Sequence, residues 1–441
     1  MSSVKKIGLF ACTGVVAGNM MGSGIALLPA NLASIGGIAI WGWVISIIGA
    51  MSLAYVYARL ATKNPQQGGP IAYAGEISPA FGFQTGVLYY HANWIGNLAI
   101  GITAVSYLST FFPALNNPIP AGIACIAIVW LFTFINMLGG AWVSRLTTIG
   151  LFLVLIPVVL TAVAGWHWFD IATYHANWNT STTTDSHAIV KSILLCLWAF
   201  VGVESAAVST GMVKNPKRTV PLATMLGTAL AGIIYIAATQ VIAVPASVMA
   251  SSGAPFAIST STILGGWAAP LVSAFTAFAC LTSLGSWMML VGQAGVRAAN
   301  DGNFPKIYGE MDKNGIPKKG LLLAAVKMTA LMILITIMNS SGGKASDLFG
   351  ELTGIAVLLT MLPYFYSCVD LIRFEGFNIR NSVSLICSVL GCAFCFIALM
   401  GASSFELSGT FIVSLIILMF YGRKMHQRQN NDSDNNTAEA L

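Results

Sequence analysis

The stretch Asn19-Met20-Met21-Gly22-Ser23-Gly24-Ile25 interrupts an apolar segment that runs from Ile7 to about Asn31. Two glycines flanking a serine allow a helix to unwind within a bilayer, and unwinding frees amide N–H groups at the start of the second half. Those amides carry the positive end of a helix dipole and suit a carboxylate. The alternative is a close helix–helix contact, because Gly18 and Gly22 are four residues apart. This stretch alone leaves both interpretations open.

The composition is that of a membrane protein that crosses the bilayer many times. The 441 residues are 56% hydrophobic and 8% charged, with a mean hydropathy of +0.78, whereas soluble domains carry about 25% charged residues. The net charge of +6 reflects loop bias and predicts no nucleic-acid partner. At about 20 residues per helix, we predict twelve spans near 7–32, 38–61, 84–112, 120–139, 146–168, 188–211, 219–244, 268–297, 320–339, 347–372, 382–401 and 405–423.

The charged loops predict the orientation. Of the 21 lysines and arginines, only Lys191 and Lys344 fall opposite the terminal side, and Lys327 lies within a span. By the positive-inside rule both termini are cytoplasmic. We expect one transporter domain over residues 1–424 and a disordered cytoplasmic tail over 425–441. The eight cysteines lie almost all in apolar runs and are interpreted as small buried residues, so we expect no metal and no cofactor.

A second interruption lies in the sixth predicted span, which reads Trp198-Ala-Phe-Val-Gly202-Val-Glu204-Ser205. The first and sixth spans each open a block of five helices, near 7–168 and 188–372, and run in opposite directions because five is odd. Inverted repeats of this kind bind their substrate where the two broken helices meet near the midplane. The sequence therefore predicts an all-α membrane protein of twelve helices, with helices 1 and 6 broken and two additional helices over 382–423.

Glu204 is the only acidic residue placed deep within a predicted span. An intramembrane carboxylate is costly unless it is paired or hydrated, so it marks a functional site by default. The alternative is a protonated glutamic acid that bonds a backbone carbonyl freed by the interruption. We favour a role in binding a cationic substrate.

Aromatic faces suit the same cation, since they attract ammonium groups without a second buried charge. Trp198 and Trp287 lie in mid-span, where an interfacial belt does not explain them. In the third span Tyr90, Asn93 and Asn97 share one helix face. The remaining candidates, which can equally be packing, belt or loop residues, are Tyr73, Tyr89, Tyr235, Tyr364, Tyr366, the charged Glu76 and Asp301, and the loop histidines His167, His175 and His187.

Gly22-Ser23-Gly24, the Trp198–Ser205 stretch and Lys214-Asn-Pro-Lys-Arg-Thr-Val-Pro221 resemble the amino acid–polyamine–organocation superfamily. The chain is most similar to its bacterial basic amino acid/polyamine antiporters, from about Lys5 to Lys424. The resemblance implies a LeuT-like fold, a homodimer and the inner membrane of a bacterium. It also implies exchange of external lysine for internal cadaverine, in acid resistance together with lysine decarboxylase, beside uptake of cadaverine with protons.

The same resemblance implies the roles of the site residues. Asn19, Gly22, Ser23 and Gly24 would hold the substrate carboxylate and α-amino group. Glu204 would be the gating, pH-linked glutamate, and Asn93 stands where the related arginine/agmatine exchanger has a cysteine. Other substrate-binding residues would be Tyr90, Ala92, Asn97, Trp198, Val201 and the stacking Trp287, and other gating residues Tyr73, Glu76, Tyr89, Tyr235, Asp301 and Tyr366.

Other functions stay open at this point. The same residues would support a proton-coupled cadaverine or lysine symporter, or an ornithine/putrescine exchanger. A channel or receptor fits poorly, because the chain has no filter motif and no extramembrane sensor domain. An enzyme fits less well, because the spans lack a metal or nucleophile constellation.

Overall fold

The computed structural model describes residues 7–65, 68–208, 210–240, 246–338, 345–402, 404, 407–408, 410–412, 414–423 and 425. These residues form helices, with a single isolated β-bridge between Ile7 and Val213. Eight helices of this described part are long and apolar enough to cross a membrane. They are α3 (Ala39–Lys63), α6 (Pro118–Asn136), α7 (Gly140–Ala164), α11 (Pro216–Gln240), α14 (Ala268–Asn300), α15 (Lys318–Met338), α16 (Ala345–Glu375) and α17 (Ser382–Met400).

A further long helix, α5 (Pro79–Leu108), has 30 residues but is not among these eight. Its polar residues, such as Gln84, Asn93 and Asn97, lower its hydropathy, and they are buried inside the protein. The helix is shielded because α14 and α16 pack along it. Polar side chains buried inside a bundle of apolar helices mark a candidate functional site.

The first predicted span is broken, but later than its glycines suggest. Helix α1 (Leu9–Gly24) continues through Gly22 and Ser23, and α2 (Leu28–Ala33) begins after a gap of three residues. Pro29 in the first turn of α2 favours a helix start there, since proline lacks the N–H that a first turn leaves unused. The interruption therefore lies at residues 25–27.

The sixth predicted span is broken where we expected. Helix α9 (Asp185–Trp198) ends at the tryptophan, and α10 (Ser205–Val208) begins just after Glu204. Between them Gly202 has φ +108°, a conformation that residues with a Cβ rarely adopt. The glycine thus permits the turn that presents Glu204.

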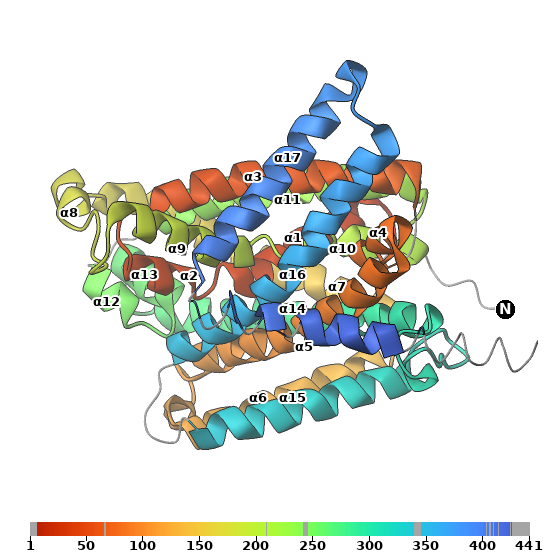
Figure 1. Cartoon of the computed structure of the whole chain (residues 1–441). Helices are drawn as coiled ribbons and strands as arrows, with labels where there is room; N and C mark the ends of the chain where they lie inside the picture. The colour runs from red at the N-terminus through yellow and green to blue at the C-terminus, as the bar shows by residue number, and fades with distance from the viewer. Residues whose placement is uncertain are drawn as a thin grey trace, which may run out of the picture.

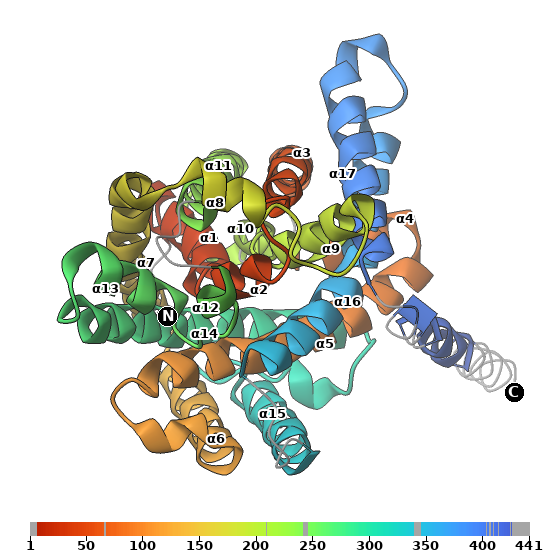
Figure 2. The same ribbon diagram turned by 90° about the vertical axis from the view of Figure 1, so that its left-hand side faces the viewer.

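The two broken spans lie inside the bundle. Helix α1 contacts α7, α11, α14 and α10, and α10 also contacts α3, so long helices surround both interruptions. Helices α6 and α15 run side by side along one flank, and α17 projects beyond the other helices with the end of α16 (Figure 1 and Figure 2). One large hydrophobic core joins the broken helices to those around them.

Most predicted spans match observed helices to within a few residues at each end. The hydropathy pattern does not predict the short helices α4 (Pro70–Ile77), α8 (Ile171–Ala176), α12 (Ala246–Ala250) and α13 (Pro255–Leu264). The last predicted span, 405–423, is described only in part, and residues 426–441 of the predicted tail lie outside the described residues. All eight cysteines are free thiols, and six of them are buried, as predicted.

The loop between α7 and α9 is bonded to the turn after α2. The N–H groups of Gly37 and Ile38 donate to the carbonyls of Asn177 and Trp178 (3.0 and 2.8 Å). In return, the Thr180 N–H donates to the Ile35 carbonyl (3.0 Å). These bonds join the end of the first broken span to the segment that leads into the second.

Asp170 caps helix α8 in this loop, and its hydrogen bonds predict how the cap responds to acid. Its carboxylate accepts the hydroxyl and the N–H of Thr173 (2.5 and 2.8 Å), and these hydrogen bonds lower the pKa of Asp170 below its ordinary value of 3.8. A carboxylate whose pKa is lower in the folded than in the unfolded state stabilises the fold at pH values above its unfolded pKa. This stabilisation is lost as the pH falls through the pKa of the folded state. We therefore expect the cap to persist from pH 7 to pH 5 and to weaken only below about pH 4.

Amide hydrogen exchange over residues 170–180, corrected for the intrinsic pH dependence of exchange, measures this prediction. Protection should be equal at pH 7 and pH 5 and lower at pH 3.5. The variant Asp170→Ala should show reduced protection at all three pH values, because it has no capping oxygen. Loss of protection in the unmodified chain at pH 5 would contradict the prediction.

Candidate functional site

The two interruptions are in direct contact. A Cβ added to Gly24 would lie 3.1 Å from Ala199 Cα, and one added to Gly202 would lie 3.3 Å from Asn19 Cβ. The Asn19 side-chain amide donates to Ser205 Oγ (2.8 Å), which joins α1 to α10. Glycine at both positions allows two irregular backbone segments to approach this closely. The predicted meeting of the broken helices is thus observed.

Glu204 lies fully buried at this meeting point. The Tyr89 hydroxyl donates to its Oε1 (2.6 Å) and the Tyr364 hydroxyl to its Oε2 (2.6 Å). The Gly202 N–H also donates to Oε2 (3.2 Å). No lysine or arginine of the described residues forms an ion pair with it. A buried carboxylate that only neutral donors hold favours the binding of a cation nearby.

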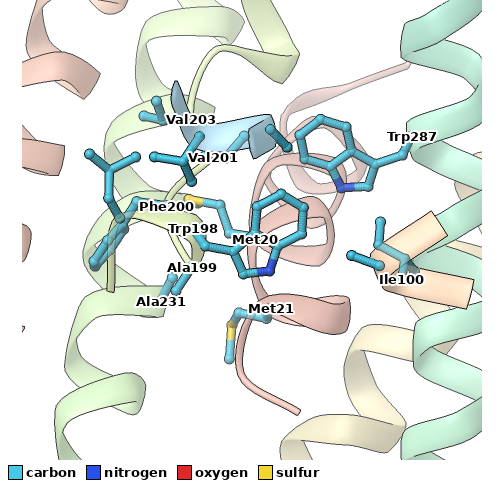
Figure 3. Close-up of a cluster of buried hydrophobic side chains, with 14 of the residues drawn as sticks. Met20, Met21, Ile100, Trp198, Ala199, Phe200, Val201, Val203, Ala231 and Trp287 are labelled. Carbon is cyan, nitrogen blue, oxygen red and sulfur yellow. The ribbon is translucent and has the colours of Figure 1, made fainter. Parts of the chain in front are cut away.

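Two tryptophans form an aromatic wall beside the interruptions. Trp198 ends α9 and Trp287 lies on α14, with ring centroids 6.5 Å apart and planes 15° from parallel (Figure 3). Trp287 is fixed because its Nε1–H donates to the Asn19 carbonyl (3.1 Å). Gly96 of α5 leaves room for Trp198, since a Cβ there would lie 3.0 Å from Trp198 Cη2. Indole faces attract ammonium groups and also pack against methylene chains.

Helix α5 supplies buried amides whose hydrogen-bonding capacity is unused. Asn93 donates to the Tyr89 carbonyl (2.7 Å), but its Oδ1 has no partner within the described residues. Both polar atoms of Asn97, and Asn19 Oδ1, are likewise buried without a partner in that part of the chain. Such groups are costly unless something satisfies them. A polar ligand held here would supply the missing partners.

Two of the residues that the resemblance places in the site have other neighbours. Ala92 lies in a small separate hydrophobic cluster with Leu88, Leu359 and Ile417, and the Tyr90 ring packs edge-on against Phe304 and Tyr308. Val201 is buried within the interruption (Figure 3). For Gly22 and Ser23 only the helical backbone is described, and their surroundings lie outside the described part. The proposed roles of these five residues stay predictions.

Two of the predicted gating residues contact the site. The Tyr89 hydroxyl donates to Glu204, and the Tyr235 hydroxyl donates to the Ala199 carbonyl (2.9 Å). Tyr73 is buried elsewhere, against the Tyr57 ring (centroids 6.3 Å apart). Others form contacts of their own: Tyr366 donates to Gln84 Oε1 (2.7 Å), Asp301 pairs with Arg297 (2.8 Å), and Glu76 lies 3.7 Å from Arg373.

Sequence reasoning missed several residues of the site. Tyr364 appeared only as one aromatic candidate among others, although it holds Glu204. Ser205 and Gly96 received no role. Tyr107 was not considered, yet its hydroxyl donates to the Ala26 carbonyl (2.8 Å) in the first interruption, much as Tyr235 does in the second. Nothing in the sequence distinguishes these tyrosines, because only the fold brings each one to an unpaired carbonyl.

Among the residues that the structure describes, no group of three or more His, Cys, Asp or Glu side chains is placed to hold an ion.

Comparison with known proteins identifies the family. A family model described as amino acid permease matches residues 7–421. The chain belongs to the amino acid permease family. This permease is 90% identical over 440 residues to the cadaverine/lysine antiporter of Escherichia coli K12, covering 99% of both chains. It is 34% identical to the putrescine transporter PotE of the same strain, covering 84% of this chain and 85% of the relative.

A more distant relative extends the comparison. The permease is 31% identical to the putrescine transporter PotE of Haemophilus influenzae, over 95% of this chain and 96% of the relative. The described residues contain eight candidate spans, and the curated relatives are an antiporter and transporters, so the permease is a multi-pass membrane transporter and not an enzyme, as the sequence predicts. The family confirms the resemblance found in the sequence, and the roles that it implies for the site residues stay predictions.

Proposed function

We propose that this permease exchanges external lysine for internal cadaverine. The observation that carries the proposal is the buried Glu204 carboxylate, held by three neutral donors where two interrupted helices meet. A carboxylate so placed favours cationic substrates. The 90% identity to an antiporter named for cadaverine and lysine supports these two cations as the substrates.

The proposed architecture has twelve spans, two inverted repeats of five and two further helices. Asn19, Gly22, Ser23 and Gly24 hold the lysine carboxylate and α-amino group. Cadaverine has no carboxylate, so Glu204 and the Trp198 and Trp287 faces hold the diamine. The repeats rock around this single site, which opens alternately to each side of the membrane.

The exchange moves charge, and the decarboxylation linked to it consumes protons. Lysine enters with one positive charge and cadaverine leaves with two, so each cycle exports one net charge. Decarboxylation of lysine consumes a cytoplasmic proton, and exchange coupled to lysine decarboxylase therefore amounts to proton extrusion. This supports growth in acid. We place the permease in the bacterial inner membrane with both termini cytoplasmic, as a homodimer.

Counterflow in proteoliposomes tests the proposal. Vesicles are loaded with unlabelled cadaverine, lysine, putrescine or buffer alone, and uptake of labelled lysine is followed at acidic external pH. Uptake should require internal cadaverine or lysine. Equal uptake into empty vesicles that carry a proton gradient would replace the exchanger with a symporter.

The putrescine transporters among the relatives favour one second candidate, an ornithine/putrescine exchanger. Competition by diamines of different chain length separates the two. A lysine/cadaverine site should prefer the five-carbon diamine, and a preference for the four-carbon diamine would favour the second candidate.

A further inference from the structure

Lys327 is a cation inside an apolar helix. It follows Lys318, the first residue of α15, by nine positions, which places it about 14 Å along the helix axis. Lysines near helix ends extend to the interface, but one this far in is costly and calls for a partner. No carboxylate of the described residues forms an ion pair with it.

Two tyrosine rings take the place of that carboxylate. The Lys327 Nζ lies 4.7 Å from the centroid of Tyr90 and 5.1 Å from that of Tyr308. Phe304 completes the cluster, with centroids 5.0 Å from Tyr90 and 5.2 Å from Tyr308. We call Tyr90, Phe304 and Tyr308 the aromatic cage. The ammonium group lies over the rings of Tyr90 and Tyr308, and Phe304 packs against both of these rings.

The cage joins three parts of the chain. Tyr90 belongs to α5, Tyr308 ends the short 3₁₀ helix Lys306–Tyr308, and Lys327 belongs to α15. Gly295 of α14 lies against the Tyr90 ring, since a Cβ there would be 3.4 Å from it. The lysine therefore fixes one turn of α5 against its neighbours.

That turn of α5 also carries a principal contact of the transport site. Tyr89, adjacent to Tyr90 in sequence, donates to Glu204 (2.6 Å). Successive side chains on a helix point about 100° apart, so the Tyr89 contact and the Tyr90 contact together define the rotation of this turn. We expect that releasing the Tyr90 contact would let the Tyr89 contact shift.

We propose that Lys327 is a positioning residue of the transport site. Its ammonium, held by the aromatic cage, sets the rotation of α5 that aligns Tyr89 with Glu204. The inference rests on the proposed exchange activity. Lys327 touches no substrate, and it acts through Tyr90 on the geometry of the carboxylate.

The test compares variants in proteoliposome counterflow, with KM, the maximal rate and the melting temperature in detergent measured for each. Lys327→Met should raise KM for both lysine and cadaverine about tenfold, with a maximal rate within twofold and little change in melting temperature. Lys327→Arg should restore most of the loss, because a guanidinium group also binds aromatic faces. Lys191→Met, which removes an exposed lysine from α9, is the matched control and should behave like the unmodified chain.

Tyr308 provides an independent test of the cage. Tyr308→Leu should reproduce the rise in KM, whereas Tyr308→Phe, which keeps the ring, should stay within about twofold of the unmodified chain. The double variant Lys327→Met/Tyr308→Leu should have a KM no higher than that of either single variant, because both substitutions remove the same interaction.

Three outcomes overturn the inference. They are unchanged KM in Lys327→Met, a loss confined to the maximal rate and melting temperature, or a Lys327→Arg variant no better than Lys327→Met. Failure of the unmodified chain to exchange would instead refute the proposed function. Normal exchange by the unmodified chain with an unaffected Lys327→Met would refute this inference alone.

Discussion

Replacing Glu204 with Gln is expected to reduce exchange of lysine for cadaverine by two to three powers of ten. The carboxylate accepts the hydroxyls of Tyr89 and Tyr364 and the N–H of Gly202. An amide has only one acceptor atom, so its NH₂ group would face a hydroxyl that now donates. A cation bound at the proposed site would also lose this buried counter-charge, and removing one partner of a buried charge pair costs about 3–5 kcal/mol.

Two measurements make this prediction specific. Exchange is measured from pH 5 to pH 8 with equal amounts of folded protein, and the melting temperature shows that Glu204→Gln folds.

The milder variant Tyr364→Phe removes one hydrogen-bond donor and keeps the charge of Glu204, so the exchange rate should fall only about tenfold. A Glu204→Gln variant with the exchange rate and pH profile of the unmodified chain would show that the carboxylate is not used.

Gly202→Ala carries the second-largest expected effect. Gly202 has φ +108°, a conformation that costs a residue with a Cβ about 1–2 kcal/mol. The new methyl group would also lie 3.2 Å from Trp287 and 3.3 Å from Asn19, so both side chains must shift. Because Trp287 and Asn19 belong to the proposed site, we expect exchange to fall about ten- to hundredfold.

Gly266→Ala is the matched control. Nothing lies within 4 Å of a Cβ added at Gly266, and its backbone does not require glycine. This variant should exchange like the unmodified chain. If Gly202→Ala were as active as Gly266→Ala, with equal substrate affinity, the interruption would not need its observed geometry.

The sequence was sufficient to predict the helical class and most span positions, because a bilayer demands long apolar helices. Glu204 could be identified for the same reason, as the one acidic residue deep in a span. Gly202 marked the second interruption correctly. At the first, Gly22 and Gly24 stay helical and the interruption lies at residues 25–27, directly after Gly24, since glycine allows an interruption without fixing its position.

The partners of each site residue could not be predicted. Tyr364 reaches Glu204 from a helix 160 positions away in the sequence, and many other tyrosines fit the same pattern. Ala92 and Tyr90 share α5 with Asn93 and Asn97, but a rotation of about 100° per residue sends them to other neighbours. Such contacts depend on how helices are rotated against one another, which span hydropathy does not encode.

The loop that bonds Gly37 and Ile38 to Asn177 and Trp178 has a mechanical consequence. It continues directly into α9, so α2, the second half of the first interrupted span, and α9, the first half of the second, are joined by these hydrogen bonds and by their direct contact. We expect the two half-helices to move together and not independently. An entrance to the proposed site that they line would then open as a single hinged unit, and the length of this linker would limit how far it swings.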